Sequence, residues 1–210
     1  LHVRDAASAP MARLTVGICD SLPKMVAHRL LLPIMSVKNL KLTCYEGELE
    51  DLLGDLALHR LDVVLSDRAA PNNSNLKLYS HALGATDIAL YGTKTWVKSA
   101  RQNFPQSLSS VPILLPTAHT AMRDRLDRWF EHKHITPNVV GKFEDSALLQ
   151  TFGANGMGIF PAAEWVQEDL VSQYGVSRLG ACTGVKEHFF AIGTERKVHH
   201  PLVQSLLQHK

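Results

Sequence analysis

Residues 48–67 read ELEDLLGDLALHRLDVVLSD, and this stretch decides the fold. Its first four leucines recur at i, i+3, i+4 and i+7 from position 49, so they form one apolar stripe on a helix over residues 48–60. Acids in the first turn and His59-Arg60 in the last turn have the charge order that suits the helix dipole. The short apolar run at residues 63–65 then predicts a strand that is buried on both faces of a parallel sheet.

Polar side chains follow this strand directly, at Ser66-Asp67, and a turn-rich stretch at residues 71–75 comes next. An open α/β sheet binds its ligands at the carboxyl ends of its strands. We therefore expect the helix–strand unit to form one wall of a small-molecule site.

The composition excludes several classes of protein. The chain has 210 residues and a formal net charge of +2, which is too small to indicate DNA or an anionic membrane as a direct partner. No apolar run approaches the roughly 20 residues of a transmembrane helix, and residues 1–10 lack the apolar centre of a signal peptide. Cys19, Cys44 and Cys182 show no Cys-x-x-Cys spacing, which is typical of a reducing cytoplasm. We therefore expect a cytoplasmic protein without a cofactor.

Strand and helix patterns alternate along the whole chain, and they predict an α/β fold. In the first part we expect strands at residues 13–19, 40–45, 63–65, 76–80 and 87–91, and helices at residues 23–35 and 48–60. In the second part we expect strands at residues 111–115, 139–143 and 159–160, and helices after Thr120 and at residues 146–152 and 164–172. A last strand at residues 189–193 and a helix at residues 201–208 complete the pattern.

This order predicts two Rossmann-like lobes. The first lobe takes residues 13–91 together with residues 187–210, because the last segment is too short to build a third lobe. The second lobe takes residues 92–186. Two chain crossovers, a central cleft and hinges near residues 91–93 and 184–187 follow from this division. Residues 1–12 precede the first strand and are predicted to be a linker.

The usual catalytic motifs are absent from the sequence, so we do not expect an enzyme. The glycine-rich residues 153–158 superficially suggest a phosphate loop, but a helix precedes them and a strand follows, which is the reverse of a dinucleotide-binding turn. The eleven histidines have no partners at metal-ligand spacing, so capping or solvent-exposed histidines are the simpler interpretation.

Acidic residues recur at the predicted ends of strands: Asp20, Glu46, Asp67, Glu144 and Asp145. Buried carboxylates need a compensating charge, so these acids favour a cation or an amine as ligand. Helix N-termini near Ser21, Thr120 and Ser146 would by themselves favour an anion instead. In the simplest interpretation, the acids cap helices and face water. The sequence leaves these alternatives open.

Several segments resemble the effector-binding domain of LysR-type transcriptional regulators. The resemblance covers residues 13–208 and is carried by LTVGICDSLPKMV, CYEGELEDLLGDLALHRLDVVLSD, DIALYGT, ILLP, FEDSALLQTFGANGMGIFPA and HHPLVQSLL. It is closest to the branch that activates sodium/proton antiporter genes, through Leu65-Ser66-Asp67-Arg68 and residues 141–160. The resemblance implies a periplasmic-binding-protein-like fold of type II, with an effector cleft between its two lobes.

The resemblance also implies which positions contact the effector. By matching motifs they are Asp20, Ser21, Ser66, Asp67, Thr117, His119 and Thr120, and Phe143, Glu144, Asp145, Ile159 and Phe160 are expected to face the same cleft. Glu46 is added as an acid at a predicted strand end. Many relatives bind small carboxylates through hydroxyl groups, whereas acids accompany the hydroxyls here. We therefore predict a weak Na⁺ site at Asp20, Asp67 and Glu144.

The function implied is that of an effector-sensing domain of a transcriptional activator that controls sodium/proton antiporter genes in response to Na⁺, Li⁺ or pH. The alternatives are a two-lobe solute-binding protein and a LysR-type regulator that senses an organic small molecule. Family members form homodimers or tetramers and reach promoter DNA and RNA polymerase through an N-terminal winged helix-turn-helix. That DNA-binding domain is expected to precede residue 1 in the full-length protein.

Overall fold

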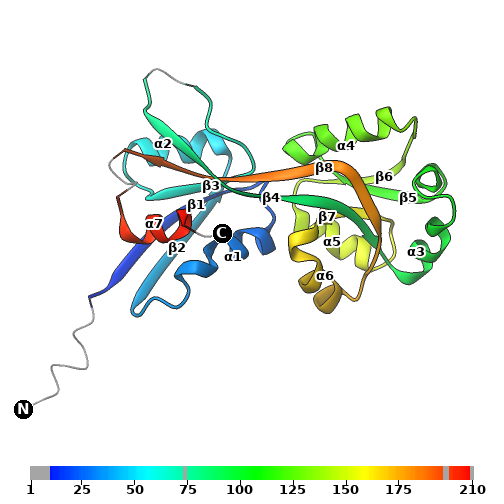
Figure 1. Cartoon of the computed structure of the whole chain (residues 1–210), viewed down its shortest axis with the longest axis horizontal. Helices are drawn as coiled ribbons and strands as arrows, with labels where there is room; N and C mark the ends of the chain where they lie inside the picture. Colours follow the sequence, from blue (N-terminus) through cyan, green and yellow to red (C-terminus); the bar gives the residue numbers. More distant parts are fainter. Residues whose placement is uncertain (1–9, 73–74, 196–198, 209–210) are drawn as a thin grey trace, which may run out of the picture. The chain divides into compact units, whose positions relative to one another are not determined.

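A computed structural model describes residues 10–72, 75–195 and 199–208 of the chain (Figure 1). Residues 1–9 of the predicted linker lie outside this description. The strands belong to a six-stranded mixed sheet, in the order β2-β1-β3-β8-β4-β7, and to a two-stranded sheet, β5-β6. The chain divides into two compact units. The α/β fold predicted from the sequence is confirmed.

The strands are β1 Ala12–Cys19, β2 Leu40–Gly47, β3 Val63–Ser66, β4 Leu78–Gly92, β5 Pro112–Pro116, β6 Asn138–Phe143, β7 Phe160–Ala163 and β8 Ser177–Thr194. The α-helices are α1 Lys24–Leu31, α2 Leu49–Ala57, α3 Lys94–Arg101, α4 Ala121–His132, α5 Ser146–Ala154, α6 Gln167–Tyr174 and α7 Pro201–Leu207. Three short 3₁₀ helices lie at Leu32–Ile34, Gln106–Ser109 and Glu164–Val166. None of the described helices is long and apolar enough to span a membrane.

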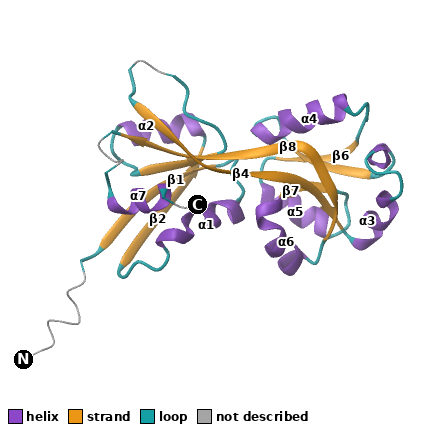
Figure 2. Ribbon diagram, viewed as in Figure 1, coloured by secondary structure: helices purple, strands orange, loops and turns teal. Residues whose placement is uncertain are grey.

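Unit 1 contains residues 1–20, 27–83 and 190–210. Its central strand, β1, is parallel to both β2 and β3, and the end of β8 runs antiparallel to β3. Helix α2 packs on this sheet (Figure 2). It does so through the predicted leucine stripe, since Leu52, Leu53 and Leu56 are buried. Strand β3 is buried at all four positions, as predicted, but its neighbours make the sheet mixed rather than purely parallel.

Unit 2 contains residues 21–26 and 84–189. Strands β5 and β6 are parallel, and β7 pairs antiparallel with the second half of β4. Helix α4 lies on one side of these strands, and α5 and α6 lie on the other (Figure 1). The β-α-β-α-β-α order predicted for the second lobe is observed from β5 to α6. The lobe boundaries predicted after Tyr91 and before Glu187 stay a prediction.

Two strands are longer than the sequence indicated. Residues 76–80 and 87–91 were expected to form two strands, but β4 runs without a break through Leu78–Gly92. The last strand was expected at residues 189–193, whereas β8 is 18 residues long. The missed residues are 81–86 of β4 and 177–188 of β8, and most of them are exposed or half-buried, so these segments lack the apolar pattern by which buried strands are recognised.

The helix boundaries differ in smaller ways. Helix α1 ends at Leu31 rather than at residue 35, and Pro33 lies in the 3₁₀ turn that follows, because a proline ring cannot continue an α-helix without a break. Helix α3 was not predicted, because it buries only Val97 and Ala100. The cap of α5 is Asp145, whose side chain accepts a hydrogen bond from the amide of Ala147, and not the predicted Ser146.

Candidate functional site

A small cavity of about 40 Å³ lies within unit 2, at the carboxyl ends of β5 and β6. Pro116 and Glu144 line it from these two strand ends. The other lining residues are Ser21, Pro23, Thr120, Met122, Ser146, Leu149, Gln150, Pro161, Ala162, Ala163, Val166 and Glu187. Strand ends of an α/β protein are the expected place for a ligand, so this cavity is the candidate functional site.

Four polar side chains that line the cavity are more than nine-tenths buried. Their exposed fractions are 7% for Ser21 and Thr120, 5% for Gln150 and 2% for Glu187. They are set among prolines, alanines and other apolar residues. All four carry oxygen atoms that can accept hydrogen bonds or coordinate a cation, and Glu187 adds a carboxylate. The cavity therefore combines an apolar wall with a small group of buried oxygen atoms that can accept hydrogen bonds or coordinate a cation.

The first turn of α4 fixes one of these groups. The hydroxyl of Thr120 accepts a hydrogen bond from the amide of Arg123 at 3.2 Å and donates one to the carbonyl of Thr117 at 3.5 Å. The side chain of Arg123 lies nearby and is only 14% exposed. Its guanidinium donates to the carbonyl of Pro116 at 2.8 Å and to Asp127 at 2.9 Å, which ties the end of β5 to α4.

The first turn of α5 fixes the opposite wall. Asp145 caps the helix, and its carboxylate also lies 3.6 Å from the ammonium group of Lys24. Glu144 and Ser146 flank this cap and line the cavity, although Glu144 itself is exposed. Asp145 thus has the helix-capping role that the sequence left open as the alternative to a cation site, and its carboxylate also lies near a positive charge.

Four of the predicted effector positions belong to unit 1. Ser66 and Asp67 are buried at the end of β3, where the Asp67 carboxylate lies 3.3 Å from the guanidinium of Arg68. Asp20 is exposed after β1. Glu46 is also exposed but lies within β2, where its charge adds to partial burial in raising the pKa of the neighbouring Cys44 thiol.

The remaining predicted positions belong to unit 2. Ser21, Thr120 and Glu144 line the cavity together. Thr117 and His119 are half-buried in the loop before α4, and Phe143 stacks on Phe152 with ring centroids 5.1 Å apart. Ile159 and Phe160 are fully buried core residues that do not line the cavity. Contact between these positions and an effector stays a prediction.

Glu187 and Gln150 are the buried polar residues of the cavity that sequence reasoning missed. The sequence signal for Glu187 was the even spacing of the apolar residues Val185 and Phe189 on either side of it; in the structure all three are buried, whereas Lys186 and His188 are exposed. This alternation is that of a strand with one buried face. Gln150 carried no comparable signal, because its helix places apolar residues around it and only the tertiary fold shows which face is covered.

The described residues contain no group of three or more His, Cys, Asp or Glu side chains that could hold a metal ion. Of the three acids proposed for a Na⁺ site, Asp20 and Asp67 belong to unit 1 and Glu144 belongs to unit 2. A cation site at these three residues therefore stays a prediction. The side-chain oxygen atoms that the structure brings together are those that line the cavity.

Comparisons with known proteins agree with the fold. Residues 8–209 match the LysR substrate binding domain. The chain is 29% identical over 192 residues to the transcriptional activator protein NhaR of Escherichia coli, and the match covers 91% of this chain and 63% of NhaR. It thus spans somewhat less than two thirds of the length of that relative.

Solved structures show the same fold at low sequence identity. CbnR, a LysR family transcriptional regulator, aligns with a TM-score of 0.70 at 16% identity, over 95% of this chain and 68% of CbnR. The reduced regulatory domain of OxyR2 from Vibrio vulnificus aligns with a TM-score of 0.67 at 13% identity, over 95% and 96% of the two chains. The periplasmic-binding-protein-like fold and the non-enzymatic class predicted from the sequence follow from the family match. The chain belongs to the LysR substrate binding domain family.

Proposed function

We propose that this chain is the effector-sensing domain of a transcriptional activator that controls sodium/proton antiporter genes in response to Na⁺, Li⁺ or pH. The observation that carries the proposal is the cavity in unit 2, where the Glu187 carboxylate is 98% buried beside the oxygen-bearing side chains of Ser21, Thr120 and Gln150. In the full-length protein, promoter DNA and RNA polymerase would be reached through the predicted winged helix-turn-helix domain.

The size and chemistry of the cavity favour a small cation. A volume of about 40 Å³ leaves room for only a few water-sized groups, since a cavity needs roughly 10–15 Å³ for each water molecule. Hard cations prefer oxygen ligands, and carboxylate, hydroxyl and amide oxygens are all present here. Coordination of a sodium ion by these oxygen atoms would couple the site to sodium. Protons compete with a metal ion for its ligands, so such binding would also depend on pH.

Two similarities support the assignment of sodium/proton antiporter genes as the targets. NhaR, to which the chain is 29% identical, is a transcriptional activator. The resemblance of residues 65–68 and 141–160 to the antiporter branch supplies the narrower assignment, and residues 141–160 include α5 with Gln150. An organic amine is the second candidate, because prolines, Met122 and Val166 give the cavity an apolar wall that an alkyl chain would contact.

A melting-temperature titration tests the proposal. We expect NaCl and LiCl to raise the Tm of this chain more than KCl at equal ionic strength, because only Na⁺ and Li⁺ would bind the folded site. A ligand at ten times its Kd stabilises the folded state by about 1.4 kcal/mol. Glu187→Gln removes the charge at nearly constant volume, so the difference between the cations should vanish. Glu168→Gln, at an exposed acid on α6, is the matched control and should keep the difference.

Two results would contradict the cation proposal. Equal shifts with all three salts in the unmodified chain would exclude selective cation binding. Unchanged selectivity in Glu187→Gln would exclude the cavity as the site. A shift with putrescine but not with NaCl, lost in Glu187→Gln, would favour the organic amine instead.

We also propose that the chain pairs with a second copy in an antiparallel arrangement, with α1 of one protomer beside α5 of its partner. Large apolar side chains are exposed on both segments: Leu32 and Met35 just after α1, and Leu148 and Phe152 on α5, at 43–49% exposure. Leu148 and Phe152 are four residues apart, so they share one helix face. Burying such side chains is a general driving force for association.

Light scattering checks this pairing. We expect Phe152→Lys to convert a dimer into a monomer at micromolar concentration, because a charged group would have to be buried in the interface. Val171→Lys is the matched control, since Val171 is 44% exposed on α6, outside the proposed contact. A monomer in the unmodified chain, or equal effects of the two substitutions, would contradict the arrangement.

A further inference from the structure

A second and larger depression lies elsewhere in unit 2, where the C-terminal half of α4 faces residues 183–185 of β8. It is an open groove of about 760 Å³, and we call it the basic groove. Four basic side chains line it, against one acid, Glu131: they are Arg125, Arg128, His132 and His134. Its volume falls within the range of about 300–1,000 Å³ that is usual for small-molecule sites.

Backbone contacts hold both arginines at this groove. The guanidinium of Arg125 donates to the carbonyl of Lys186 on β8 at 2.8 Å. The Nε of Arg128 donates to the carbonyl of Asp124, one turn earlier in α4, at 3.3 Å. A guanidinium carries five N–H donors, so one hydrogen bond to a carbonyl orients the group and leaves its other N–H donors available to a ligand. Orientation before binding reduces the entropy that a ligand contact would cost.

Trp129 provides an independent observation. It lines the groove but is only 6% exposed, and its indole Nε1 is buried without a hydrogen-bond partner among the described residues. Buried polar groups in folded proteins nearly always have a partner, and an acceptor atom of a ligand in the groove would supply one for this donor. A ligand atom that accepts a hydrogen bond from Trp129 and lies beside positively charged side chains is best matched by an anionic oxygen.

We infer that the basic groove is a second ligand site, for a small oxyanion that carries a phosphate or a carboxylate group. The anionic oxygens would bind the guanidinium groups of Arg125 and Arg128, and an oxygen atom would accept from the indole of Trp129. This site shares no lining residue with the cavity of the proposed function, so the two proposals stand independently.

Tryptophan fluorescence gives a direct test, because Trp129 lies in the site. Potassium phosphate and potassium citrate are titrated separately into this chain, with KCl as the ionic-strength control and without sodium. We expect a saturable change in emission with at least one of the two anions, and the anion that gives it identifies phosphate or carboxylate as the bound group. Trp129→Phe should lose the change, while Trp96 and Trp165 remain as emitters.

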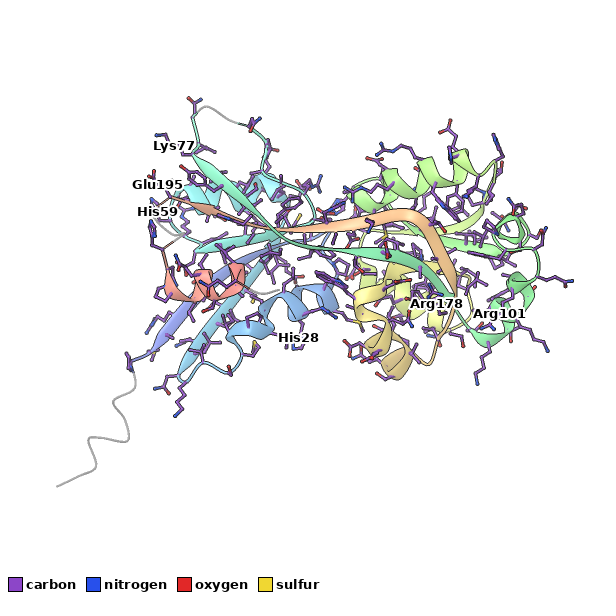
Figure 3. The ribbon with its side chains drawn as sticks, in the orientation of Figure 1. His28, His59, Lys77, Arg101, Arg178 and Glu195 are labelled. Atoms are coloured by element: carbon purple, nitrogen blue, oxygen red, sulfur yellow. The ribbon has the colours of Figure 1, made fainter. Side chains whose placement is uncertain are left out.

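The arginine variants separate site binding from general salt effects. Arg125→Gln and Arg128→Gln should each weaken the anion about tenfold or more, because a charge-assisted hydrogen bond is lost. Arg101→Gln is the matched control: this arginine, labelled in Figure 3, is also exposed and also donates to a backbone carbonyl, that of Arg178. The inference is overturned if both anions act like KCl, or if the Arg125 and Arg128 variants bind as the Arg101 variant does.

Discussion

Leu56→Ala is expected to lower the free energy of unfolding by about 2–5 kcal/mol, the usual cost of a large-to-small change in a core. Leu56 is fully buried in a cluster with Leu52, Leu53, Val64 and Ile192. This cluster joins α2 to β3 and to the end of β8, so the cavity left by Ala would lie where three segments of unit 1 meet. Urea denaturation followed by far-UV circular dichroism measures the change.

Leu58→Ala is the matched control, because Leu58 directly follows α2 and is 63% exposed. Surface substitutions of this kind usually change stability by less than about 0.5 kcal/mol. Equal losses in the two variants would mean that the leucine stripe does not form this core contact. The comparison therefore tests the element from which the fold was predicted.

The elements that the sequence predicted well are those whose burial is complete. Strand β3 is a continuous apolar run because both of its faces are covered. Helix α4, which was expected after Thr120, buries Met122, Leu126, Trp129 and Phe130 at helical spacing. In contrast, α3 and the middle of β4 are largely exposed, and exposed segments carry no apolar period. Their structure depends on tertiary contacts with residues far away in the chain, which the local sequence pattern does not indicate.

The residues of the candidate site also differ in whether the sequence could predict them. Ser21, Thr120 and Glu144 were predicted because they follow strands, and the carboxyl ends of strands can be located from sequence. Gln150 and Glu187 come from the interior of a helix and a strand, so only the folded chain brings them to the cavity. Asp67 and Asp145 lie close to Arg68 and Lys24, and their position at strand ends did not indicate these ion pairs.

Gly153→Ala is expected to destabilise the protein, although glycine within a helix normally costs about 1 kcal/mol relative to alanine. Gly153 lies in α5, where a Cβ atom would stand 2.2 Å from Cδ1 and 2.5 Å from Cε1 of Phe160. Phe160 is fully buried and its ring packs against Tyr91, with centroids 6.2 Å apart, so it has little room to move. Overpacking of this kind costs about 1–3 kcal/mol, and urea denaturation measures it.

Gly54→Ala is the opposite case and serves as the control. Gly54 lies in α2, and a Cβ atom added there would meet nothing within 4 Å. Only the helix propensity changes at this position, so we expect the free energy of unfolding to rise by up to about 1 kcal/mol. The same substitution should therefore have opposite signs in two helices. A gain in stability at both positions would show that α5 and β7 do not approach as closely as described, and the wall that α5 contributes to the cavity would then have to be revised.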